Sequence, residues 1–226
     1  MIDLRRSGPV FVLAMDAGEN RFNGDFIAAM NRALDEVERA GSPAALVTTG
    51  AGKFYSNGLD LDWMIAQGSA GARRALHDAL AVLARVLTLP VYTVAAVNGH
   101  AFGAGAQLAV AHDLRLMRAD RGFFCMPEID MKVQLHPGMV AILQARLPLA
   151  TAHEVIVTGT RYGGEAARAA GIVERALPEA DLVPAAVEAA AAMAAKADPA
   201  MAKLKASLYP QVLAALASMP DDVFGG

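Results

Sequence analysis

Residues 86–112 contain no Asp, Glu, Lys or Arg, so 27 consecutive residues offer no charged side chain to water at neutral pH. A membrane-spanning helix needs about 20 apolar residues without interruption. This stretch is instead interrupted by Pro90 and by the polar, glycine-rich residues 98–107. We therefore expect no membrane span here. The stretch predicts a buried strand, a turn and a buried helix in the core of one protein domain.

The composition narrows the class of protein further. The chain has 226 residues with a net charge of −3, which argues against nucleic acid as a partner because such proteins normally carry a basic face. The single cysteine, Cys125, excludes an intramolecular disulfide and fits a reducing compartment. Residues 1–6 lack the apolar core of a signal peptide. We expect a cytoplasmic protein.

Strand-length apolar runs alternate with helical patterns in the first part of the chain, and helical patterns dominate after Pro137. Such alternation predicts an α/β fold with parallel strands and helical crossovers. Strands are expected at residues 10–15, 44–49, 91–97, 114–117 and 122–126. Helices are expected after Asn23 as an N-cap, at residues 71–87 and 103–111, and in the alanine-rich residues 184–195.

The first stretch with chemical interest is residues 52–61, Gly-Lys-Phe-Tyr-Ser-Asn-Gly-Leu-Asp-Leu. It follows an expected strand and precedes a short helix. A glycine at such a turn lets backbone N–H groups point into a cleft. Asp60 suits the start of a helix. Taken alone, this stretch also fits an ordinary loop between a strand and a helix.

The second stretch is residues 98–107, Asn-Gly-His-Ala-Phe-Gly-Ala-Gly-Ala-Gln, which lead into a helix. Residues 103–106 carry no side chain larger than a methyl group. A helix that begins so bare lets a ligand approach its N–H groups, where the helix dipole is positive. Close packing of a helix on a strand is the alternative. The stretch is neither a phosphate loop nor the full dinucleotide glycine pattern.

The third stretch is residues 121–130, in which Glu128 follows an apolar strand and the sequence Cys-Met-Pro. Desolvation beside such residues raises the pKa of a carboxyl group and suits it to act as a base. A solvated carboxylate at the end of a strand is the alternative.

Together the three stretches resemble the enoyl-CoA hydratase/isomerase family, the crotonase superfamily, over nearly the whole chain. Residues 54–61 and 112–123 are similar to plant peroxisomal-type Δ3,Δ2-enoyl-CoA isomerases. The resemblance implies a crotonase-like fold of repeated ββα units, with a core at residues 1–176 and a shortened helical region at residues 177–226. It also implies an acyl-CoA thioester as substrate and a homotrimer or a dimer of trimers, assembled partly through that helical region.

The resemblance assigns roles to three residues. The backbone N–H groups of Leu59 and Ala104 would form an oxyanion hole, and Glu128 would be the catalytic acid and base. Hydratases of the family carry a second carboxylate three residues beyond the second donor, where this sequence has Gln107. Because an amide has no titratable proton, Gln107 can orient a substrate but cannot act as a base.

The predicted activity is therefore migration of a double bond, from a 3-enoyl-CoA to a 2-enoyl-CoA, with Glu128 as the proton shuttle. We expect no metal and no redox cofactor, and CoA only as part of the substrate. Further substrate contacts are predicted at Gly58, Asp60, Gly103, Gln107, Met126 and His136. Arg21 and Lys53 are candidates for contacts with CoA.

Several alternatives remain open from the sequence. Asp60 and His136 can serve as helix caps, Met126 can belong to the core, and Arg21 and Lys53 can be surface residues. The activity can be that of a hydratase working with Glu128 alone, or of another crotonase-fold enzyme such as a dehalogenase or thioesterase. A non-catalytic acyl-CoA-binding protein is a further alternative. A dinucleotide-dependent oxidoreductase is disfavoured because the glycine fingerprint is missing.

Overall fold

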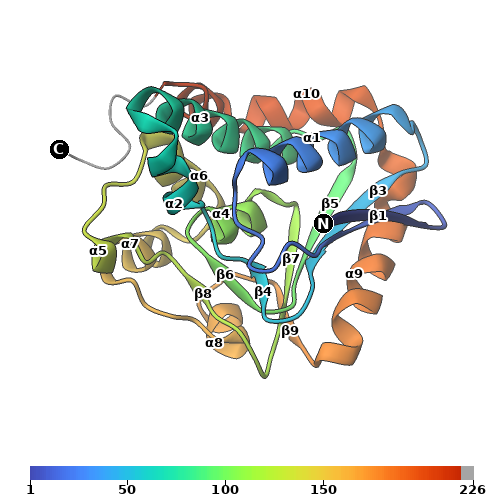
Figure 1. Ribbon diagram of the computed structural model, residues 1–226. Coiled ribbons are helices and arrows are strands. Elements are labelled where there is room, and N and C mark those ends of the chain that lie inside the picture. Colours follow the sequence, from blue (N-terminus) through green and yellow to red (C-terminus); the bar gives the residue numbers. More distant parts are fainter. Residues whose placement is uncertain (220–226) are drawn as a thin grey trace.

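The computed structural model describes residues 1–219 and contains two β-sheets surrounded by helices (Figure 1). Along the chain the elements are β1 (Ile2–Ser7), β2 (Val10–Met15), α1 (Gly24–Arg39), β3 (Ala45–Gly50), β4 (Phe54–Ser56), α2 (Leu61–Ala66), α3 (Gly68–Leu87), β5 (Tyr92–Val97), β6 (His100–Phe102), α4 (Ala104–Ala111), β7 (Leu114–Arg118), β8 (Phe124–Cys125), α5 (Glu128–Met131), α6 (Pro137–Arg146), α7 (Leu149–Thr158), α8 (Gly164–Ala169), β9 (Arg175–Leu177), α9 (Glu179–Met193), the 3₁₀ turn η1 (Ala194–Lys196), α10 (Pro199–Leu208) and α11 (Pro210–Leu216).

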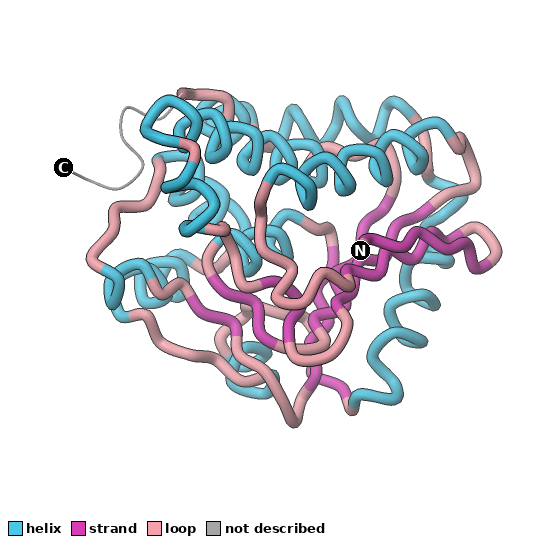
Figure 2. The backbone as a smooth tube through the Cα atoms, in the orientation of Figure 1, coloured by secondary structure: helices cyan, strands magenta, loops and turns pink. Residues whose placement is uncertain are grey.

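The six-stranded sheet has the order β1-β2-β3-β5-β7-β9, and the three-stranded sheet has the order β4-β6-β8 (Figure 2). The hairpin of β1 and β2 is antiparallel, and the other pairs are parallel. Three successive ββα units, which begin at β3, β5 and β7, each give one strand to each sheet. This arrangement confirms the predicted α/β fold of repeated ββα units.

The strands expected at residues 10–15, 44–49, 91–97 and 114–117 are present within a residue or two. The strand expected at residues 122–126 is shorter, since β8 covers only Phe124–Cys125. Strands β1, β4, β6 and β9 were not expected. β1 is an edge strand with charged residues, and the other three have three residues each, too few to show an alternating pattern.

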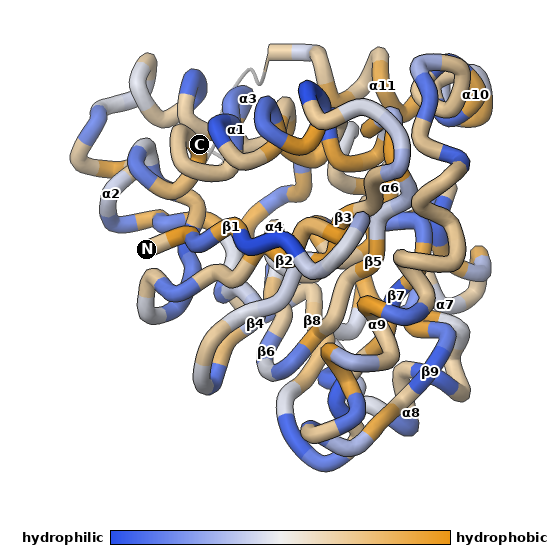
Figure 3. The backbone as a smooth tube through the Cα atoms, turned by 90° about the vertical axis from the view of Figure 1, so that its right-hand side faces the viewer, coloured by the Kyte–Doolittle hydropathy of each residue, from blue (hydrophilic) through white to orange (hydrophobic). Residues whose placement is uncertain are grey.

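The uncharged residues 86–112 form the end of α3, then β5, β6 and α4, and every residue of α4 is buried. Within residues 1–219 no helix is long and apolar enough to cross a membrane. On one face of the large sheet, α9 packs against β3 and β5 (Figure 3). Ala186 and Ala190 of α9 share a buried apolar cluster with Val47 and Val94 of these strands. Helices α1, α3 and α4 pack on one another within the main apolar core. Small side chains bring these layers close together.

The C-terminal helices are tied to the core by charged groups. The ammonium of Lys205 in α10 is 2.6 Å from the Asp113 carboxylate and donates to the carbonyl of Val91 at 2.8 Å. Arg146 in α6 donates to the hydroxyl of Tyr209 at 2.8 Å. The division at residues 176 and 177 stays a prediction, and residues 220–226 of the predicted shortened end lie outside the described part.

Candidate active site

A cavity of about 790 Å³ lies beside the N-terminal ends of α4 and α5. The helices whose residues contribute to its wall, α2 to α6, gather on the left-hand half of Figure 1. Its wall is formed by Arg21, Asn57, Gly58, Leu59, Leu61, Asp62, Leu76, Phe102, Gly103, Ala104, Cys125, Pro127, Glu128, Met131, Val133, Gln134, Leu135, His136, Pro137, Met139, Arg161, Ser218 and Met219.

The first predicted donor, Leu59, lies in the loop between β4 and α2. Gly58 has a positive φ of 82°, which favours glycine, and a methyl group built on it would lie 2.8 Å from the carbonyl oxygen of Phe102. The same methyl group would be 3.3 Å from the nitrogen of Ala104. The loop therefore passes directly against the second predicted donor.

The second predicted donor, Ala104, is the first residue of α4, and Gly103 before it has a φ of 51°. The first N–H groups of a helix have no partner within the helix. Within residues 1–219, the backbone N–H groups of Leu59 and Ala104 donate to no carbonyl or side chain. Two adjacent, unpaired N–H groups at one cavity wall can stabilise a negative oxygen.

Glu128 begins α5 and completes the site. A methyl group on Gly103 would lie 3.2 Å from its Oε1, so the carboxylate lies next to the start of α4. Its Oε2 is buried and has no hydrogen-bond partner in the described part of the chain. Burial raises the pKa of Glu128 to about 7, from an ordinary value of 4.5. A carboxyl group with this pKa can both accept and return a proton near neutral pH.

The structure brings together most of the predicted site residues. Those that line the cavity are Leu59, Ala104, Glu128, Gly58, Gly103, His136 and Arg21. Those that do not line it are Asp60, Gln107, Met126 and Lys53. The four residues of the second group lie elsewhere in the fold. Substrate contacts at these four positions stay predictions.

Asp60 is the N-cap of α2 and accepts from the N–H of Trp63 at 3.3 Å. Met126 is fully buried in the apolar core. His136 both lines the cavity and caps α6, since its Nδ1 accepts from the N–H of Gly138 at 3.1 Å. Asp130, two residues after Glu128, lies in the same helical turn, α5.

Gln107 is fully buried in α4, and neither atom of its side-chain amide has a hydrogen-bond partner within residues 1–219. A buried amide without partners costs free energy. Gln107, at the position where the resemblance places the second carboxylate of the hydratases, therefore has no side-chain hydrogen bond within residues 1–219.

Sequence reasoning missed part of the cavity wall. Leu76 comes from α3, Arg161 from the loop after α7, and Ser218 and Met219 follow α11. No local pattern marks these residues, because only the fold brings their distant segments to one cavity. Arg161 has its guanidinium 5.7 Å from the ring centroid of Phe102 and adds a positive charge to the wall.

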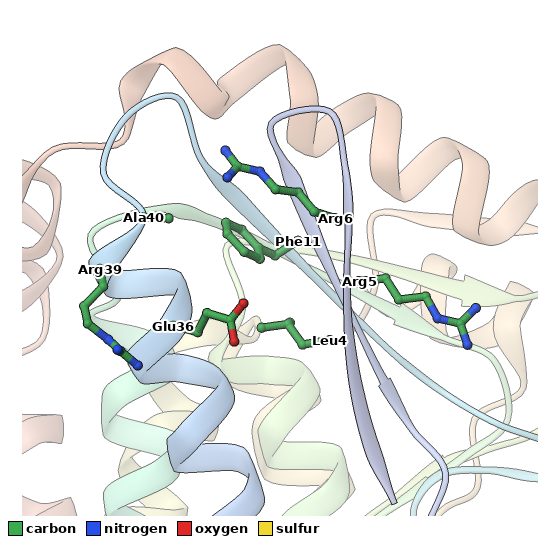
Figure 4. Close-up of a pocket in the computed structure, with 7 residues that line it drawn as sticks. All are labelled: Leu4, Arg5, Arg6, Phe11, Glu36, Arg39 and Ala40. Carbon is green, nitrogen blue, oxygen red and sulfur yellow. The ribbon is translucent and has the colours of Figure 1, made fainter.

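A second hollow of about 270 Å³ lies between the β1–β2 hairpin and α1 (Figure 4). Its charged residues, Arg5, Arg6, Glu36 and Arg39, are all exposed. The side chains of Arg5 and Arg39 extend to opposite sides of the hollow (Figure 4). The one acid of this second hollow, Glu36, is exposed, whereas the Oε2 of Glu128 is buried. The cavity beside Glu128 is therefore the candidate active site.

Known protein families include one that matches nearly the whole chain. The model of the enoyl-CoA hydratase/isomerase family matches residues 6–219. The chain belongs to this family. It is 36% identical to the peroxisomal enoyl-CoA delta isomerase 2 of Arabidopsis thaliana, over 94% of this chain and 93% of that protein. It is 35% identical to enoyl-CoA delta isomerase 3 of the same plant, with the same coverage.

Solved structures of this family have the same fold. An apo structure of an enoyl-CoA isomerase from Mycobacterium tuberculosis matches with a TM-score of 0.87 and 27% identity, over 95% of this chain and 93% of that one. The human mitochondrial delta3-delta2-enoyl-CoA isomerase matches with a TM-score of 0.88 at 20% identity, over 95% of this chain and 85% of that one, and this likeness concerns the fold alone. As a family member, the chain is an enzyme, and enzymes of this family act on acyl-CoA thioesters.

Proposed function

We propose that the protein is an enoyl-CoA isomerase that converts a 3-enoyl-CoA into the conjugated 2-enoyl-CoA. The observation that carries this proposal is the half-buried Glu128, whose Oε2 is buried and whose pKa is raised to about 7, beside the N–H groups of Leu59 and Ala104, which have no partner within residues 1–219. The one other carboxylate among the described wall residues, Asp62, is exposed. The plant relatives named as delta isomerases support the same reaction.

The proposed reaction begins when the thioester carbonyl accepts hydrogen bonds from Leu59 and Ala104. Glu128 removes a proton from C2, and the electron pair of that bond moves into the dienolate, whose oxygen carries the negative charge. Protonated Glu128 returns the proton to C4, and the double bond then lies between C2 and C3. One oxyanion donor is worth about 2.7–4 kcal/mol of the barrier in known enzymes, and a positioned base contributes about 10²–10⁴-fold.

This chemistry needs one acid–base group, because the proton that leaves C2 is the proton that arrives at C4. Hydration would instead require a water to be activated as well as a proton delivered, and Gln107 cannot exchange a proton. The proposed reaction needs neither a metal nor a redox cofactor, since nothing is oxidised. Arg21 and Arg161 are the cations of the wall, and we place the anionic CoA portion on their side.

Assembly and location are part of the proposal. We propose a homotrimer or a dimer of trimers, and the exposed Leu204 and Leu208 of α10 support burial of this surface between subunits. Sedimentation of the purified protein would measure the assembly. A cytoplasmic location stays a prediction, and the name of one plant relative includes the word peroxisomal.

The test of the proposal is Glu128→Gln with 3-hexenoyl-CoA as substrate. We expect turnover to fall by at least about 10²-fold, because the amide cannot carry the proton. The matched control is Asp130→Asn, which neutralises an exposed carboxylate in the same helical turn and should keep turnover near normal. Near-normal turnover by Glu128→Gln would rule out Glu128 as the base.

The pH profile tests the same residue in the unmodified enzyme. Only the carboxylate form removes a proton, and its pKa is raised to about 7. We therefore expect kcat/KM to fall about tenfold per pH unit below pH 7 and to level off above it. A profile that is flat between pH 5 and 8 would contradict this assignment.

A second candidate is a hydro-lyase of the same family. A carnitinyl-CoA dehydratase from Salmonella is 32% identical to the chain, over 90% of this chain and 78% of that protein. Parallel assays with 2-hexenoyl-CoA and 3-hexenoyl-CoA separate the two. Fast hydration of the first with no migration in the second would favour the hydro-lyase over the isomerase.

A further inference from the structure

Asn20 is a fully buried residue in the segment between β2 and α1, and it has a left-handed backbone with φ of 52°. This conformation is uncommon outside glycine, although asparagine adopts it more readily than most residues. Asn20 does not line the cavity. Its burial and backbone therefore need another explanation than contact with a substrate.

The side chain of Asn20 joins two backbone segments, residues 15–17 and residues 54–55. Its Nδ2 donates to the carbonyl of Met15 at 3.0 Å, to that of Phe54 at 3.3 Å and to that of Tyr55 at 3.1 Å, while its Oδ1 accepts from the N–H of Ala17 at 2.8 Å. Met15 ends a strand of the large sheet, whereas Phe54 and Tyr55 belong to the small sheet. One amide thus fixes the strand that leads into the first donor loop.

The backbone carbonyl of Asn20 is linked, through Ser56, to the residue before Leu59. Its carbonyl accepts from the hydroxyl of Ser56 at 2.7 Å, and the same Oγ accepts from the N–H of Gly58 at 3.3 Å. Gly58 directly precedes Leu59. Both polar atoms of the Asn20 amide and its backbone carbonyl are therefore bonded to residues 54–56, to the end of β2 at Met15 or to the turn that holds Asn20 itself.

We propose that Asn20 is the positioning residue for the first oxyanion donor. It fixes β4 through its amide and residue Gly58 through Ser56, and so sets where the N–H of Leu59 points. This inference rests on the proposed role of Leu59 as an oxyanion donor. Asn20 touches neither the substrate nor the reacting atoms.

A role in stability alone would give different results. A donor held in the wrong place weakens binding of the charged dienolate more than binding of the neutral thioester. Loss of positioning therefore lowers kcat and leaves KM nearly unchanged, whereas loss of stability lowers the unfolding temperature and leaves kcat per folded molecule unchanged.

The experiment uses Asn20→Gly, which permits the positive φ and removes only the side-chain hydrogen bonds. With 3-hexenoyl-CoA we expect kcat to fall about 10- to 100-fold while KM changes less than about threefold. The control is Asn31→Ala, which removes a side-chain acceptor 2.7 Å from Arg85 between α1 and α3, away from the cavity. It should leave kcat unchanged.

A second readout reports on the oxyanion hole without turnover. Acetoacetyl-CoA forms an enolate with a near-ultraviolet absorption band, and its charge lies on the oxygen that the two donors would hold. We expect the enolate fraction of the bound ligand to fall in Asn20→Gly and, less strongly, in Ser56→Ala, which keeps the Asn20 amide. Should Asn20→Gly not fold, Ser56→Ala carries the same test.

The two proposals fail in different ways. If the unmodified protein does not isomerise 3-hexenoyl-CoA, or if Glu128→Gln retains full turnover, the proposed function is wrong. If the unmodified protein is active, Glu128→Gln is inactive, and the folded Asn20 and Ser56 variants keep both normal kcat and a normal enolate fraction, then Asn20 has no positioning role.

Discussion

The segments that carry Leu59 and Ala104 end at the same cavity wall, and different forces hold them there. The Leu59 loop is held by hydrogen bonds from residues 17–23: Asn57 donates its N–H to the carbonyl of Glu19 at 2.9 Å, and Phe22 donates its own to the carbonyl of Gly58 at 2.8 Å. The start of α4 has no side-chain cap, and its first residues are Ala and Gly. Close packing of the backbone therefore positions the N–H of Ala104. Hydrogen bonds to residues far away in the sequence position the N–H of Leu59.

This difference predicts opposite sensitivities. A contact between bare backbones tolerates no added atom, because an interior packed at crystal density has no room for one. A hydrogen-bonded loop tolerates some change of shape but not the loss of a donor or acceptor. Adding a methyl group should therefore disturb the start of α4 most, and deleting a polar atom should disturb the Leu59 loop most.

The largest effect is expected for Gly105→Ala. A methyl group there would lie 2.2 Å from the carbonyl oxygen of Ser56 and 2.7 Å from its Cβ, so it would push α4 and the Leu59 loop apart. We expect kcat to fall at least about 10²-fold, and the free energy of unfolding to fall by about 1–3 kcal/mol. Steady-state kinetics measure kcat, and urea unfolding measures the free energy of unfolding.

Gly163→Ala is the matched control for this substitution. A methyl group on Gly163 has no heavy atom closer than 4.0 Å, and its φ of −70° suits alanine. We expect its unfolding free energy to change by less than about 0.5 kcal/mol. A normal kcat for Gly105→Ala would show that the contact between the two donor segments is not needed.

A smaller effect is expected for Thr48→Val, which cuts a buried connection between the segments. The Oγ1 of Thr48 lies 2.7 Å from the hydroxyl of Tyr55 in β4 and 2.9 Å from Nε2 of His112, the C-cap of α4. Burial lowers the pKa of His112 to about 4, so the ring is neutral at pH 7. Its Nδ1 donates to the carbonyl of Leu108, hence Nε2 accepts from Thr48 and Thr48 accepts from Tyr55.

Valine has nearly the shape of threonine but leaves the hydroxyl of Tyr55 and the Nε2 of His112 without partners. Each buried unpaired group costs about 1–3 kcal/mol, so we expect the free energy of unfolding to fall by about 2–4 kcal/mol, with a smaller loss of kcat than for Gly105→Ala. Thr151→Val, which loses a single hydrogen bond to the carbonyl of Ala170, should cost about 1 kcal/mol. If both variants lose the same free energy of unfolding, the two hydrogen bonds of Thr48 stabilise the protein no more than the single hydrogen bond of Thr151.

The same difference explains what the sequence could predict. The bare start of α4 and the apolar surroundings of Glu128 depend on neighbours in the sequence, so local pattern could predict both, and the catalytic roles of these residues stay predictions. The partners of Asn20 in β4 lie 34 and 35 residues along the chain, and nothing near Asn20 indicates them. The alternation of strands and helices predicted the α/β fold, whereas three-residue strands such as β4 and β6 are too short to leave a pattern.

The smallest effect is expected for Gln107→Met, which tests whether the second segment needs any polar side chain. Gln107 is fully buried, both atoms of its amide lack partners within residues 1–219, and it does not line the cavity. Methionine has a similar length and carries no group that must be hydrogen-bonded. We expect kcat with 3-hexenoyl-CoA to stay within about twofold, and the free energy of unfolding to rise by about 1 kcal/mol.

The outcome of that substitution also bears on the choice of reaction. If Gln107→Met lowers kcat strongly while the protein stays as stable as before, the amide contacts the substrate or a water in the working enzyme, and the start of α4 is not held by packing alone. If activity is retained, Gln107, where the hydratases have a second carboxylate, is a core residue without a catalytic role in this protein. A proton shuttle through Glu128 alone then accounts for the chemistry, since the side chain at position 107 supplies no group that exchanges a proton.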